Sequence, residues 1–113
     1  MSQITTHILD TSVGKPASNV PVKLAQKTAD GSWHTLAEGT TNADGRVADL
    51  LAKDTVIPTG IYKMTFYTEG YFAAQNSPCF YPVVEIQFTI YDTTHYHIPL
   101  LLSPFGYSTY RGS

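Results

Sequence analysis

Short segments in which apolar and polar residues alternate recur along the whole chain, separated by turn signals about every ten residues. The segments are residues 4–10, 20–27, 33–40, 46–48, 60–67, 83–91, 94–102 and 107–111. Successive side chains of a strand point to opposite faces, so each segment has one apolar face to bury. Many short strands joined by frequent turns are typical of a β-sandwich. The sequence therefore predicts an all-β fold of two four-stranded sheets.

The connections between these segments fit the same fold. Glycine-containing turns are expected at residues 12–16, 29–32 and 42–45. Residues 71–76 lack the alternation, and one or two helical turns are expected there. The 113 residues show no internal repeat and no linker, so a single domain over residues 1–113 is expected.

Composition narrows the classes of function. The formal net charge is −2 and the lysines are scattered, so a nucleic-acid partner is not expected. The longest wholly apolar run, residues 98–102, is too short to cross a membrane. Cys79 is the only cysteine and no signal-peptide pattern precedes residue 4, so a cytoplasmic location is expected. With 42% hydrophobic and only 14% charged residues, part of the surface is expected to be covered by self-association.

Two histidines are predicted to lie on strand faces that point away from the core. His7 shares its face with Thr5 and Leu9, and His97 shares its face with Pro99. An outer face of this kind is unusually apolar for a solvated surface. Histidine titrates near neutral pH and serves as a general acid or base, so a pair in an apolar cleft fits a catalytic site. The structural alternative is that each is an ordinary half-buried polar residue.

The other candidate residues carry weaker signals. His95 and His97 share a strand face, as zinc ligands could, but no cysteine or carboxylate nearby completes the set, so no metal is expected. His34 lies next to a turn and is expected at the surface. Arg46 follows an Asp-Gly turn dipeptide, and the residues alone leave it as a solvated charge.

Several segments, in order and along nearly the whole chain, resemble the transthyretin family. They are residues 7–10 (HILD), 14–17 (GKPA), 44–46 (DGR), 60–62 (GIY), 95–104 (HYHIPLLLSP) and 107–113 (YSTYRGS). The closing Tyr-Arg-Gly-Ser is similar to the signature of the enzymes in that family, the 5-hydroxyisourate hydrolases. The hormone-carrying members lack this tail and lack counterparts of His7, Arg46 and His97. The resemblance implies a transthyretin-like β-sandwich with one short helix.

The resemblance also implies an activity. It implies hydrolysis of 5-hydroxyisourate, formed when urate is oxidised, to 2-oxo-4-hydroxy-4-carboxy-5-ureidoimidazoline, without a cofactor. His7 and His97 would activate the water and move protons, and the planar guanidinium of Arg46 would stabilise negative charge. The residues expected to bind the substrate are Tyr110, Arg111, Gly112 and Ser113. Enzymes of the family are homotetramers with a channel between two dimers, so a homotetramer is expected.

Two other classes of protein remain as alternatives. One is a non-enzymatic carrier that binds a small aromatic ligand in the same channel, although a carrier gains little from two histidines and an arginine. The other is an adhesion module of the immunoglobulin type, which would be expected to carry an export signal and often disulfides. Which of the two histidines would act as the base is left open.

Overall fold

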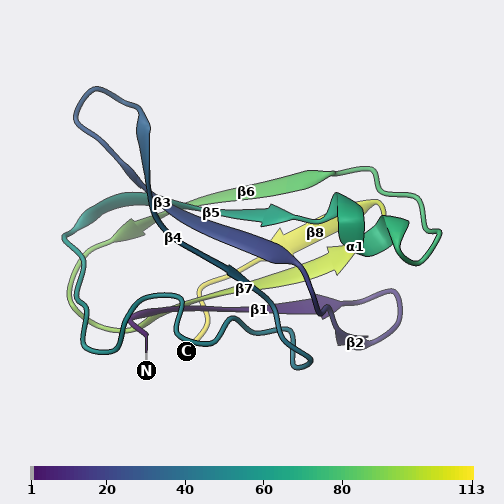
Figure 1. The fold of residues 1–113 in the computed structure, drawn as a ribbon. Coiled ribbons are helices and arrows are strands. Elements are labelled where there is room, and N and C mark those ends of the chain that lie inside the picture. Colours follow the sequence, from purple (N-terminus) through teal and green to yellow (C-terminus); the bar gives the residue numbers. More distant parts are fainter. Residues whose placement is uncertain (1) are drawn as a thin grey trace.

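The computed structural model describes residues 2–113 and shows two packed β-sheets (Figure 1). One sheet has the strand order β2-β1-β7-β8 and the other β4-β3-β5-β6. The first contains β1 (Ile4–Asp10), β2 (Lys15–Pro16), β7 (Tyr96–Ser103) and β8 (Gly106–Thr109). The second contains β3 (Pro21–Lys27), β4 (Trp33–Thr40), β5 (Gly60–Tyr67) and β6 (Val83–Ile90). The predicted all-β sandwich of two four-stranded sheets is confirmed.

The core lies between the sheets and is filled by every second residue of the strands. In β1 the buried residues are Ile4, Thr6, Ile8 and Asp10, and the residues between them are half-buried. Tyr62 and Phe66 from β5 are fully buried against this layer. Each large apolar side chain buried in this way contributes about 1.5–3 kcal/mol. The opposite face of the first sheet does not contribute to this core, and its residues are available to form a site.

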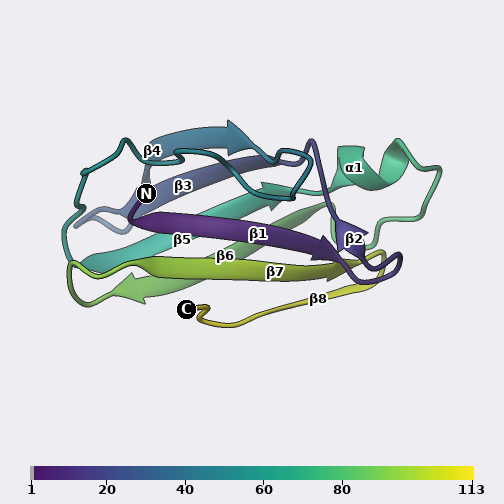
Figure 2. The same ribbon diagram turned by 90° about the horizontal axis from the view of Figure 1, so that it is seen from below.

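The two central strands of the first sheet, β1 and β7, run parallel, whereas the other strand pairs are antiparallel. Figure 2 looks onto this sheet, with β1 and β7 side by side. The register pairs Thr5 with His97 and His7 with Pro99. Since side chains alternate between faces, the outward residues of β1 lie beside those of β7. Residues 92 positions apart in the sequence therefore come into contact.

One predicted strand is absent from residues 2–113 of the structure, and a short strand forms where the sequence predicted a turn. Residues 46–48 form no strand, and Arg46 makes only an isolated bridge to His7. The short strand at the edge of the first sheet consists of Lys15 and Pro16, which pair with Asp10 and Leu9. A proline is tolerated there because an edge strand needs no ladder hydrogen bond on its outer side.

The single helix within residues 2–113, α1 (Glu69–Ala73), confirms the predicted helical turns but begins before residue 71. It is anchored by buried Phe72 and by the Tyr71 hydroxyl, which donates a hydrogen bond to Oδ2 of Asp10 at 2.7 Å. No helix within residues 2–113 has the length and apolar character needed to cross a membrane.

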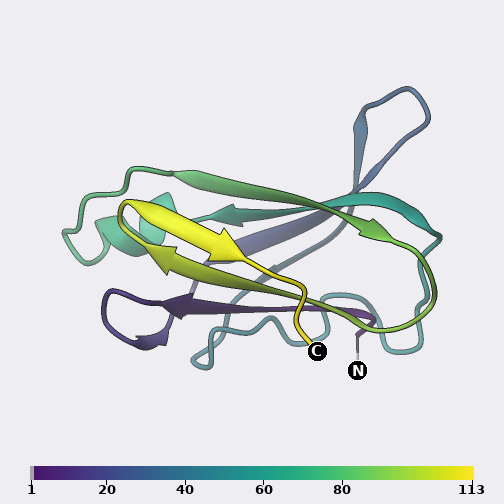
Figure 3. The same ribbon diagram turned by 180° about the vertical axis from the view of Figure 1, so that it is seen from behind.

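The C-terminal tail, residues 110–113, follows the last strand. β8 ends at Thr109 rather than at residue 111 as predicted. Beyond it, Gly112 returns to β7 and forms an isolated bridge to His97. Figure 3 shows this tail running alongside β7 toward the C-terminus.

Candidate active site

A pocket of about 570 Å³ opens on the outer face of the first sheet, where β1, β7, the loop before Arg46 and the tail meet. The residues that line it are Thr5, His7, Arg46, His95, His97, Tyr110, Gly112 and Ser113. The structure thus brings together all the site residues predicted from the sequence except Arg111.

A tight loop brings Arg46 next to His7. The side-chain oxygen of Asn42 accepts a hydrogen bond from the Arg46 N–H at 3.1 Å, and the Gly45 carbonyl accepts one from the Ile8 N–H at 2.9 Å. Gly45 has φ +74°, and a Cβ there would lie 2.5 Å from the Ile8 carbonyl oxygen. Glycine therefore lets the loop approach β1 closely enough to form the His7–Arg46 bridge.

Both His7 and His97 are biased toward the neutral form. Burial, followed by the positive charge of Arg46, lowers the pKa of His7 below its ordinary 6.5, against an opposing effect of Asp44. Burial also lowers the pKa of His97, and the charges of Arg46, His95 and His7 lower it further. A neutral imidazole has a free lone pair that can accept a proton. The pair is therefore suited to removing a proton from water near neutral pH.

The tail lies directly against His97. The Gly112 N–H donates a hydrogen bond to the His97 carbonyl oxygen at 2.9 Å. A Cβ on Gly112 would lie 3.1 Å from Cγ and 3.2 Å from Cβ of His97, and closer still to Cδ2. Such contacts are too short for carbon atoms, so a glycine is required for the tail to lie this close to the imidazole.

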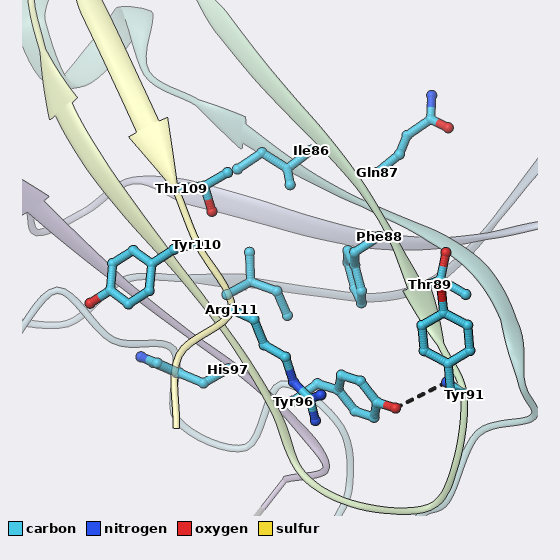
Figure 4. Close-up of a pocket in the computed structure, with 11 residues that line it drawn as sticks. Ile86, Gln87, Phe88, Thr89, Tyr91, Tyr96, His97, Thr109, Tyr110 and Arg111 are labelled. Carbon is cyan, nitrogen blue, oxygen red and sulfur yellow. Dashed lines mark hydrogen bonds between the residues drawn. The ribbon is translucent and has the colours of Figure 1, made fainter.

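Arg111 points to the other side of the tail. Its guanidinium carbon lies 4.4 Å from the centre of the Tyr96 ring, and the Tyr96 hydroxyl donates a hydrogen bond to Oδ1 of Asp92 at 3.0 Å. Figure 4 shows Arg111 extended toward Tyr96, with Tyr110 turned away from it. Arg111 lines a second cavity, of about 270 Å³, bounded mainly by β6 and β7. The structure therefore gives Arg111 the geometry of an anchor for the tail.

Two further residues line the pocket although the sequence did not place them in the predicted site: Thr5 and His95. The Thr5 hydroxyl lies 2.8 Å from Nε2 of His95 and 2.8 Å from Nδ1 of His97. The available signal was the alternation, which puts Thr5 on the face of His7 and His95 on the face of His97. The missing information was the register that places the two strands side by side.

The donors of this pocket are imidazoles, hydroxyls and a guanidinium. Within residues 2–113, no group of three or more His, Cys, Asp or Glu is arranged to hold a metal ion. Two neutral imidazoles can take and return protons, and the nearby guanidinium can stabilise an oxyanion. This combination fits the addition of water to a carbonyl group.

Known proteins of similar sequence and structure have the same β-sandwich fold as this chain. The family model described as "HIUase/Transthyretin family" matches residues 4–112. The chain is 45% identical over 114 residues to the 5-hydroxyisourate hydrolase of Mus musculus, spanning 99% of this chain and 96% of that protein. The solved structure of Klebsiella pneumoniae 5-hydroxyisourate hydrolase is 41% identical, with a TM-score of 0.86 and full coverage of both chains.

A solved transthyretin is also similar to this chain. That of Sparus aurata superposes with a TM-score of 0.91 at 38% identity, covering 99% of this chain and 97% of its own. Backbone similarity alone does not separate the hydrolases from the transthyretins, because both superpose closely. Family membership follows from the match over nearly the whole chain: the chain belongs to the HIUase/transthyretin family.

Proposed function

We propose that this protein is an enzyme that hydrolyses 5-hydroxyisourate, the substrate named in its Mus musculus and Klebsiella pneumoniae relatives. The observation that carries the proposal is the convergence of His7, His97 and Arg46 in one pocket, with both imidazoles biased toward the neutral form. A pocket that only binds an aromatic ligand does not need two proton-accepting imidazoles next to the guanidinium of Arg46.

The chemistry requires three contributions from the pocket. 5-Hydroxyisourate is a planar, oxygen-rich bicyclic compound, and its hydrolysis opens the six-membered ring at an acyl–nitrogen bond. One imidazole takes a proton from water while the water oxygen bonds to the carbonyl carbon. Arg46 stabilises the negative charge that develops on the carbonyl oxygen. The proton then passes to the departing nitrogen, which gives 2-oxo-4-hydroxy-4-carboxy-5-ureidoimidazoline.

In this proposal the tail holds the substrate. Tyr110 and Ser113 line the pocket, and their hydroxyls can orient a ligand rich in carbonyl and N–H groups. Arg111 contributes to substrate binding indirectly, because its stacking on Tyr96 fixes the backbone of the tail before and after Arg111.

The assembly that we propose is a homotetramer in which the outer face of the first sheet lines a channel between dimers. Leu9 and Leu101 on this face are only half-buried, and Tyr110 in the adjoining tail is exposed. An apolar surface of this kind favours burial between subunits. Light scattering should give about 50 kDa, four chains of 12.4 kDa, and a monomer at micromolar concentration would exclude the shared channel.

The decisive experiment follows freshly generated 5-hydroxyisourate by ultraviolet absorbance with and without the protein. We expect faster decay in proportion to enzyme concentration, and loss of that acceleration in the His7→Asn and His97→Asn variants. An unchanged decay rate would reject the hydrolase proposal. Binding of a small aromatic ligand without any acceleration would favour the carrier function instead.

A further inference from the structure

The Thr5 hydroxyl lies between two imidazoles, that of His97 in β7 and that of His95 just before this strand. It lies 2.8 Å from Nε2 of His95 and 2.8 Å from Nδ1 of His97, and the two rings are nearly parallel, with centres 6.4 Å apart. The parallel register fixes this arrangement, since Thr5 pairs directly with His97 and His95 lies two residues earlier on the same face. All three residues are half-buried, so the hydrogen bonds are partly shielded from bulk water.

Thr5, His95 and His97 form a chain of two hydrogen bonds, and the number of protons on these groups limits the directions that the two bonds can take. A hydroxyl has one proton, and a neutral imidazole has one N–H and one bare nitrogen. If Thr5 donates to one histidine, it can accept only from the other. Either His97 Nδ1–H donates to Thr5 and Thr5 donates to His95 Nε2, or the direction is reversed. In a continuous hydrogen-bond chain through Thr5, the two histidines consequently share a tautomer, both protonated at Nδ1 or both at Nε2, whereas a hydroxyl that accepts from both rings gives opposite tautomers and no chain.

We propose that Thr5 and His95 are positioning residues that act through His97 and relay protons to and from it. The inference rests on the proposed function, because water is the reactant. Nε2 of His97 takes a proton from the water whose oxygen bonds to the carbonyl carbon, and the Nδ1 proton passes to Thr5 Oγ1. The original hydroxyl proton of Thr5 passes to His95 Nε2. His97 thus stays neutral and His95 becomes an imidazolium.

The second half of the reaction reverses the relay. The departing nitrogen takes the Nε2 proton of His97 as its bond to the acyl carbon breaks. His95 returns its proton to Thr5, and Thr5 returns one to Nδ1 of His97. Each group recovers its starting protonation state, with no other reactant consumed.

The surroundings of His97 favour a neutral imidazole there. Burial comes first, and the positive charges of Arg46, His95 and His7 also oppose a positive charge on the His97 ring. His95 also lines a second cavity, of about 260 Å³, whose lining includes Asp54. A proton held on His95 is separated from Nε2 of His97, where water reacts, by the Thr5 hydroxyl.

Kinetics of three variants test the relay. Thr5→Val keeps the shape but removes the hydroxyl, Thr5→Ser keeps the hydroxyl, and His95→Gln keeps a hydrogen-bonding group near Nε2 but cannot take a proton. We expect Thr5→Val and His95→Gln each to lower kcat at least about tenfold with KM and Tm nearly unchanged. Thr5→Ser should retain kcat within about twofold. The Thr5→Val/His95→Gln double variant should be no slower than the slower single variant, because both changes break one chain.

A Thr5→Val enzyme with wild-type kcat would overturn the relay. So would a double variant whose loss equals the product of the two single losses, because that result indicates independent roles. ¹⁵N NMR of the imidazole nitrogens gives a readout that needs no substrate. The shared tautomer of His95 and His97 should be seen in the wild type and lost in Thr5→Val, whereas opposite tautomers in the wild type would refute the hydrogen-bond chain. If the wild type fails to turn over 5-hydroxyisourate, the proposed function fails, and NMR still decides whether the chain exists.

Discussion

Replacing Gly112 with alanine should damage catalysis while the protein stays folded. A Cβ at this position would lie 3.1 Å from Cγ and 3.2 Å from Cβ of His97, and nearest of all to Cδ2, well under 3.0 Å. Because ordinary carbon–carbon contacts are about 3.5–4.0 Å, the tail and the imidazole must separate by about 1 Å. Misplacing a catalytic group by about 1 Å can cost about 10²-fold in rate. We therefore expect kcat of Gly112→Ala to fall roughly 100-fold.

Stability should change much less than the rate. The bond most at risk, from the Gly112 N–H to the His97 carbonyl, contributes about 1 kcal/mol to the free energy of unfolding. Gly112 is not among the residues with positive φ, so alanine adds no backbone strain there. Calorimetry should show a small change in Tm, and the absorbance decay of 5-hydroxyisourate gives kcat.

Gly106→Ala is the matched control for this experiment. A Cβ on Gly106 meets only Oγ of Ser103, at 3.7 Å, which is an ordinary contact, and Gly106 lies outside the pocket. Its kcat should equal that of the wild type. The role assigned to the tail would be refuted if Gly112→Ala kept full activity, or if Gly106→Ala lost as much.

Three further predictions concern the charged and titratable groups of the pocket. Arg46→Lys should lower kcat at least about tenfold, because lysine keeps the charge but loses the planar guanidinium. Tm should not change, since Arg46 is exposed. Unchanged kinetics would show that Arg46 is an ordinary surface charge. His7→Asn and His97→Asn should each lower kcat/KM at least about tenfold. The control His34→Asn, at an exposed position on β4, should have the kcat/KM of the wild type. Full activity of either pocket variant would contradict the proposed site. Because the pKa values of His7 and His97 are lowered, kcat/KM should be constant near neutral pH and should fall toward acid pH with a midpoint below 6.5. A midpoint above 6.5 would contradict the buried, positively charged surroundings of these two histidines.

The alternation of apolar and polar residues was enough to predict which face of β1 carries the site. Ile4 and Ile8 are buried, and Thr5 and His7 are half-buried on the opposite face, as the period of two requires. This succeeds because one face of the strand must pack against the second sheet. A shift of one residue would expose the whole apolar set.

The alternation could not show which strands are neighbours. The pairing of Thr5 with His97 depends on a parallel register between distant segments, and no local pattern specifies it. The edge strand at Lys15–Pro16 was missed for a related reason, because two residues are too few to show a period. Residues 46–48 have a suitable local pattern but find no ladder partner beyond one bridge.

For the tail, two signals in the sequence disagreed. Alternation puts Arg111 opposite Tyr110 and Gly112, whereas the family resemblance assigned all of residues 110–113 to substrate binding. The structure follows the alternation, with Arg111 on Tyr96 and its neighbours in the pocket. A motif shows that its residues are used together, but strand geometry decides what each one touches.

The parallel pairing of β1 with β7 sets the order in which the molecule can assemble during synthesis. β1 leaves the ribosome early, yet the strand that must lie beside it is made only after all of β3, β4, β5 and β6. Those four strands pair with one another and can form their sheet first, while β1 waits with an unpaired edge that is open to wrong partners. Closing a loop of this length comes late and makes folding slow. The pocket therefore cannot form until β7 has been made and has paired with β1, and the tail can pair with His97 only after that step.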